Sequence, residues 1–100
     1  MKLIAVNINK ALAKKASAFD ATKRAWKLNE VKFRKNLPDF VIGVASGIIK
    51  GYYKFEDVNT DIEPKRVKFT LTNCDKNEIS RIDTFTSERN LKYFVIKHKW

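Results

Sequence analysis

Two aromatic residues in this 100-residue chain, Trp26 and Tyr52, are each flanked by cations. An aromatic ring can stack on a nucleobase while neighbouring cations neutralise phosphate, and such stacking is worth about 1–3 kcal/mol per base. Further cations after Trp26 could clamp phosphates in the same way. The candidate nucleic-acid contacts are Lys23, Arg24, Trp26, Lys27, Arg34 and Lys35 in one basic segment, and Lys50, Tyr52 and Lys54 on one face of an expected strand.

Each candidate also has an ordinary structural interpretation. Trp26 can anchor a helical segment to a sheet, and we favour this role because a tryptophan on an amphipathic segment usually buries most of its surface. Tyr52 can be covered by a neighbouring helix, with lysine stems packed over it. The lysines and arginines can form a solvated helix face. Whether Trp26 and Tyr52 are exposed or belong to the core is left open.

The charge of the chain favours a polyanionic partner. Twenty-one Lys and Arg residues against 11 Asp and Glu give a net charge of +10, of which residues 1–50 carry +8. Residues 10–35 alone hold nine basic and two acidic side chains. Nucleic acid is favoured over a membrane because no strongly apolar amphipathic face accompanies these cations. The alternative interpretation is a solvated basic surface that aids solubility.

Residues suited to catalysis or metal binding are few. His98 is the only histidine and Cys74 the only cysteine, so the sequence predicts no histidine-rich metal site, no internal disulfide and no cofactor. Asp57, Asp61 and Glu63, together with Lys65, faintly resemble the site of a metal-dependent nuclease, without its usual strand context. An enzyme is therefore the minority hypothesis.

A β-hairpin is the first element expected to position the candidates. Two apolar runs, residues 40–45 and 48–55, flank Ser46-Gly47, a pair that fits a two-residue turn. Because strand side chains alternate between faces, we expect Ile49 and Tyr53 on the core face. The candidate contacts in this run then lie on the opposite, basic face.

The other elements follow from periodicity and breaker residues. Residues 3–8, 66–72 and 91–96 predict further strands. The segment between the first strand and the hairpin is expected to be partly helical and basic, with N-caps at Asp20 or Thr22 and at Asn29. An acidic loop containing Pro64 is expected over residues 56–64, and a helical turn anchored by Ile79 and Ile82 before the last strand. The sequence therefore predicts one α+β domain over residues 1–100: a small mixed five-stranded curled sheet or pseudobarrel with one main helical segment between strands 1 and 2.

Several of these residues also carry a resemblance to a known group. Thr22-Lys-Arg-Ala-Trp26, followed by Asp39-Phe-Val-Ile-Gly-Val and Gly47-Ile-Ile-Lys-Gly-Tyr-Tyr, resembles small domains of the PUA-like superfamily, the ASCH and EVE group among them. The resemblance spans roughly residues 3–72. It implies a pseudobarrel that binds RNA or modified DNA, in some members with a base held in a pocket.

The leading prediction is a nucleic-acid-binding module for RNA or DNA, placed in the cytoplasm because no apolar run approaches bilayer length and a lone cysteine suits a reducing compartment. The second hypothesis is a protein-interaction accessory domain of a phage or mobile element, whose basic face meets an acidic protein. The third is a small metal-dependent nuclease. The sequence leaves the oligomeric state open, although an uncovered edge strand could pair two copies.

Overall fold

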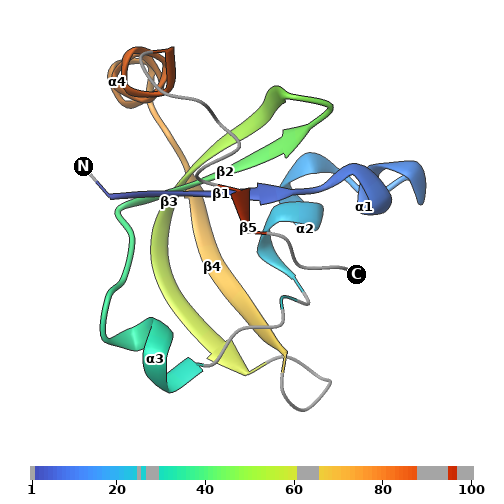
Figure 1. Ribbon diagram of the computed structural model, residues 1–100, viewed down its shortest axis with the longest axis vertical. Helices are drawn as coiled ribbons and strands as arrows, with labels where there is room; N and C mark the ends of the chain where they lie inside the picture. The colour runs from blue at the N-terminus through green and yellow to red at the C-terminus, as the bar shows by residue number, and fades with distance from the viewer. Residues whose placement is uncertain (1, 25, 27–29, 61–65, 88–94, 97–100) are drawn as a thin grey trace.

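A mixed β-sheet with strand order β4-β3-β2-β1-β5 forms the centre of the molecule (Figure 1). The computed structural model describes residues 2–24, 26, 30–60, 66–87 and 95–96. Strand β1 runs parallel to both β2 and β5, whereas β2, β3 and β4 pair antiparallel. The strands are β1 (Leu3–Asn7), β2 (Phe40–Ala45), β3 (Ile48–Thr60), β4 (Val67–Asn73) and β5 (Val95–Ile96).

The chain is α+β, but the predicted five-stranded curled sheet or pseudobarrel is wrong. Strands β4 and β5 lie at opposite ends of the strand order, so the sheet is open. It is built from four strands of five residues or more, and β5 adds only two residues beside β1. In place of one main helical segment, the described residues form four helices: α1 (Asn9–Ala13), α2 (Ala18–Lys23), α3 (Glu30–Arg34) and α4 (Lys76–Ser87).

Helices on both sides of the sheet are the physical reason that it need not close. Helices α1, α2 and α3 cover one face, over a cluster that includes Val6, Val41 and Phe69. Helix α4 covers the other face through Ile82, over a second cluster. Figure 1 shows α4 above β1, with α2 and α3 below it. Strands that are apolar on both faces would also fit a barrel. Here two layers of helices, one on each face of the sheet, bury them instead.

The β2–β3 hairpin forms as predicted. Ser46 and Gly47 both have positive φ, 52° and 75°, and connect the closing pair Ala45 and Ile48. Two positive φ values are what a two-residue hairpin turn that matches strand twist requires. The Ser46-Gly47 pair therefore fixes the position of the hairpin tip.

A β-bulge corrects the predicted faces of β3. Gly43 pairs with Gly51 and Val44 with Ile49, so Lys50 is the extra residue. The bulge reverses the alternation, and Ile49 packs on the α4 side of the sheet instead of sharing a face with Tyr53.

Strand β3 is also longer than expected. Residues 56–60, predicted as part of a loop, continue the strand and pair with β4 through Thr60. A second irregularity between Phe55 and Asp57 lets Phe55 and Val58 pack on the same face. Residues 56–60 are thus a strand, despite their acidic composition, because they pair with β4. Pro64 lies outside the described residues.

Helix α2 begins earlier than the predicted caps. Ser17 is its N-cap, and its Oγ accepts a hydrogen bond from the Asp20 backbone N–H at 3.1 Å. Thr22 instead lies inside the helix, where its Oγ1 donates to the Ala18 carbonyl at 2.7 Å. A Cβ at Gly43 would lie 2.3 Å from this Oγ1, so glycine is needed there for α2 to approach β2. The other cap candidate, Asn29, lies outside the described residues.

Helix α4 is a full helix of 12 residues where only a helical turn was predicted. At its start, Asp75 Oδ1 accepts a hydrogen bond from the Glu78 N–H at 2.8 Å, and Glu78 Oε1 accepts one from the Asp75 N–H at 2.9 Å. This reciprocal pair has the geometry of a capping box. Asp75 followed three positions later by Glu78 is a sequence signal for the start of such a helix.

Candidate nucleic-acid interface

Trp26 belongs to the core. Its side chain is fully buried, and its Nε1 donates a hydrogen bond to the Thr22 carbonyl at 2.7 Å. Its backbone pairs with Val67 through two hydrogen bonds of 3.0 and 2.9 Å. The favoured interpretation as a core anchor is therefore right, and the ring is not available to stack on a base.

The cations around Trp26 are only partly available to a ligand. Lys23 Nζ lies 3.3 Å from Asp20 and 5.0 Å from the centre of the Phe19 ring. Arg24 is exposed at the end of α2. Lys27 lies outside the described residues. This part of the predicted site thus loses its aromatic member and has one lysine already paired.

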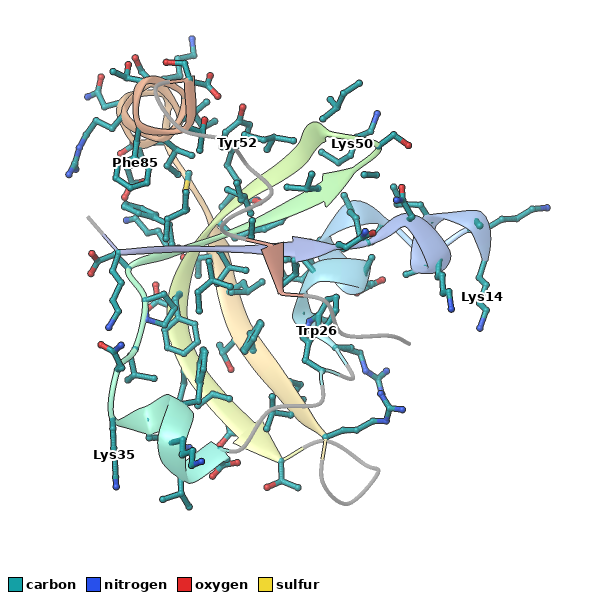
Figure 2. All side chains as sticks on the ribbon, in the orientation of Figure 1. Lys14, Trp26, Lys35, Lys50, Tyr52 and Phe85 are labelled. Atoms are coloured by element: carbon teal, nitrogen blue, oxygen red, sulfur yellow. The ribbon has the colours of Figure 1, made fainter. Side chains whose placement is uncertain are left out.

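Arg34 ties α3 to β3. Its Nε lies 3.3 Å from Glu30, and its Nη1 lies 3.3 Å from Asp57. Its Nη2 donates a hydrogen bond to the Val58 carbonyl. A guanidinium with these three partners holds α3 against β3. Lys35 is exposed beside α3, far from Lys14 of the α1 region in the view of Figure 2.

Helix α4 covers the tyrosine on β3. The Tyr52 hydroxyl donates a hydrogen bond to Asp83, and Lys54 Nζ lies 3.4 Å from Glu78. Burial raises the pKa of Tyr52 to about 12, with further contributions from the hydrogen bond and the charge of Asp83. Tyr52 is therefore covered by a helix, as its structural interpretation predicted. Two acidic side chains of α4, Asp83 and Glu78, lie where we had expected a nucleic acid to bind.

A different group of cations lies along α1 and on the hairpin tip that packs against its start. The Ile8 N–H donates to the Val44 carbonyl at 2.9 Å, and Ser46 Oγ lies 3.5 Å from Asn9 Oδ1, so the start of α1 is held against the end of the hairpin. Figure 2 shows Lys50 near the hairpin end and Lys14 beyond α1. We define the tip surface as Lys10, Lys14, Lys15, Ile48 and Lys50, all of them exposed.

The lysines of the tip surface differ from those of the predicted site. Lys10, Lys14, Lys15 and Lys50 make no ion pair with any residue that the structure describes. Of the nine candidates from the sequence, only Lys50 belongs to this surface. Residues 10–15 belong to the basic stretch 10–35, but nothing in the sequence shows that α1 begins beside the hairpin tip.

Acidic and thiol groups show no arrangement for catalysis in the described part of the chain. Asp57 accepts the Val58 N–H at 2.7 Å and pairs with Arg34, whereas Asp61 and Glu63 lie outside the described residues. No three His, Cys, Asp or Glu side chains gather as a metal site among the residues described. Burial, aided by the charge of Glu78, raises the pKa of the Cys74 thiol to about 11, so it remains protonated near neutral pH and is a poor nucleophile.

Comparisons add neither a family nor a fold neighbour. No protein-family model, curated protein or solved structure matches this chain. Within the described ranges, no helix is both long and apolar enough to cross a bilayer. The resemblance to PUA-like domains thus stays a prediction, while the pseudobarrel it implies is replaced by an open sheet.

Proposed function

We propose that this protein is a nucleic-acid-binding module of the cytoplasm that contacts phosphate through the four lysines of the tip surface. The observation that carries the proposal is that these lysines are exposed and unpaired among the described residues, on a chain of net charge +10. The candidate cations that lie near acidic groups, such as Arg34 and Lys54, stabilise the fold instead.

The chemistry at this surface is electrostatic. A lysine ammonium is a compact, strongly hydrated charge that neutralises a phosphate and displaces its condensed counterions. Each neutralised phosphate gives a slope of about −0.9 in the dependence of log affinity on log salt concentration for duplex DNA. We therefore expect steep loss of affinity with added salt.

The test is fluorescence anisotropy with labelled single-stranded RNA, single-stranded DNA and duplex DNA at several salt concentrations. Replacing Lys10, Lys14, Lys15 and Lys50 together by alanine should weaken binding and reduce the magnitude of the salt slope by about 3–4. The matched control removes the same charge elsewhere, by alanine at the exposed residues Lys35, Lys68, Lys76 and Arg81. Equal loss in both variants would show that net charge alone drives binding, and no binding by the wild type at low salt would end the proposal.

A second candidate is docking of an acidic protein on α3. Val31 on α3 is 68% exposed and Leu37, three residues after the helix, is 40% exposed, with Lys35 between them in sequence. Apolar side chains beside a cation suit an acidic, partly apolar protein segment. Binding of such a peptide that weakens with Leu37→Ser but not with Lys50→Gln, in the absence of any nucleic-acid binding, would favour this candidate.

A further inference from the structure

An exposed isoleucine stands at the end of the β2–β3 hairpin. Ile48 is 58% exposed, although it begins a strand whose next residues become covered by helices. It directly follows Gly47, and a Cβ at Gly47 would meet nothing within 4 Å. The hairpin end is therefore narrow, with small residues at the turn and one branched apolar side chain beside it.

The position of Ile48 relative to α1 follows from the strand pairing. Ile48 forms the closing pair with Ala45, and directly opposite residues in an antiparallel pair share one face of the sheet. Ala45 is buried on the face covered by α1 and α2. Ile48 thus lies on the side of the sheet that α1, the helix with Lys10, covers.

We infer that Ile48 is a wedge that enters the minor groove of duplex DNA and partly unstacks a base step. The inference rests on the proposed nucleic-acid-binding function and deepens it by naming the substrate. Proteins that bend DNA insert Ile, Leu, Met, Phe or Pro between base steps while basic side chains hold the flanking phosphates. The tip surface has both parts, since Ile48 has Lys50 on its own strand and Lys10 on the adjacent helix.

Rigidity of the tip supports insertion. An unstacking wedge must keep its direction while base pairs resist it, and the hairpin end is braced by the Ile8 to Val44 hydrogen bond of 2.9 Å. Duplex DNA fits better than duplex RNA, because the minor groove of A-form RNA is wide and shallow and offers no narrow slot for a wedge.

The contrast with α3 strengthens the assignment to the hairpin. Val31 is as exposed as Ile48, but its helix carries Glu30, and Asp57 lies 3.3 Å from Arg34 on the same helix. Those carboxylates neutralise Arg34, so this surface attracts phosphate less strongly than the unpaired lysines of the tip surface do. Val31 therefore provides a matched control: an exposed apolar side chain outside the tip surface.

The experiment compares wild type, Ile48→Ala, Ile48→Leu and Val31→Ala on a duplex of about 20 base pairs that carries 2-aminopurine at flexible TA steps. Wild type should raise 2-aminopurine fluorescence, because unstacking relieves its quenching, and Ile48→Ala should lose this rise and about tenfold in affinity. Ile48→Leu keeps an apolar wedge and should retain both signals. The salt slope should be the same in all four proteins, because no lysine changes.

Two outcomes separate this inference from the proposed function. If wild type binds with a steep salt slope but Ile48→Ala binds equally well and no protein alters the fluorescence, the wedge is wrong and phosphate binding stands. If wild type binds no nucleic acid at low salt, both fail. Loss of affinity in Val31→Ala equal to that in Ile48→Ala would also overturn the wedge.

Discussion

Two neighbouring stretches of β3, residues 48–50 and 52–54, have similar compositions but different surroundings. Ile48 and Lys50 at the hairpin end are exposed, whereas Tyr52 and Lys54 a few residues later bond to Asp83 and Glu78 of α4. Both stretches join a lysine to a large side chain that can contact nucleic acid. The difference is coverage by a helix distant in sequence: acidic side chains of α4 contact Tyr52 and Lys54, whereas Ile48 and Lys50 stay exposed.

Replacing Ile82 by alanine tests how firmly α4 covers the strand. The side chain is fully buried between α4 and the sheet, so the variant should lose about 2–4 kcal/mol of unfolding free energy. Ile48→Ala, at the exposed end of the same strand, should change it by no more than about 0.5 kcal/mol. Urea denaturation of the two variants and of wild type measures both changes in unfolding free energy. Equal losses would contradict the expected difference between the part of β3 that α4 covers and its exposed hairpin end.

Replacing Tyr52 by phenylalanine removes one polar contact of α4 without creating a cavity. Loss of the hydrogen bond to Asp83 should cost about 1 kcal/mol near neutral pH. The folded pKa of Tyr52, about 12, lies above its ordinary value of 10.0, so the stabilising contribution is complete below pH 10 and declines as the pH rises toward 12.

Urea midpoints of wild type and Tyr52→Phe, measured from pH 7 to 11, should therefore differ by a constant amount at first and converge at the alkaline end. Ultraviolet titration at 295 nm provides an independent check, since the variant should lose a late-titrating tyrosine. A gap that persists unchanged at the highest pH would contradict the assigned hydrogen bond.

The smallest effect is expected for the two lysines. Lys54→Gln breaks an ion pair whose lysine is 44% exposed, so unfolding free energy should fall by at most about 1 kcal/mol, with nucleic-acid affinity unchanged. Lys50→Gln should leave stability unchanged and reduce the magnitude of the salt slope by about 0.9. Thermal melts of both variants measure stability, and fluorescence anisotropy measures nucleic-acid affinity. Weaker binding by Lys54→Gln alone would show that Lys54, and not Lys50, contacts the nucleic acid.

Local signals in the sequence predicted the parts of the fold that local geometry determines. Ser46-Gly47 gave the hairpin because few residues accept two positive φ values, and the alternation in residues 66–72 gave β4. Trp26 was rightly favoured as a core residue because its size makes burial the dominant energy.

The candidate site was predicted less well because it depends on tertiary contacts. The bulge at Lys50 arises from pairing between β2 and β3. Asp83, the partner of Tyr52, and Asp57, one partner of Arg34, lie more than 20 residues away in sequence. Charge counting located the basic half of the chain but could not show which cations have an acidic neighbour. The tip surface forms only because α1 packs against the hairpin in the folded protein, and this contact is not visible in the sequence.

The parallel pairing of β1 with β2 has a consequence for folding order. Leu3 aligns with Phe40, so β1 cannot pair with β2 until the intervening segment with α1, α2 and α3 has been made and closed into a loop. Strands β2, β3 and β4 instead follow one another as a meander, whose contacts are more local and form faster. During synthesis β1 is made before β2, and only its face with Val6 packs on the side of α1 and α2. Leu3 and Ala5 lie on the other face, which α4 covers, and α4 is made last of the four described helices.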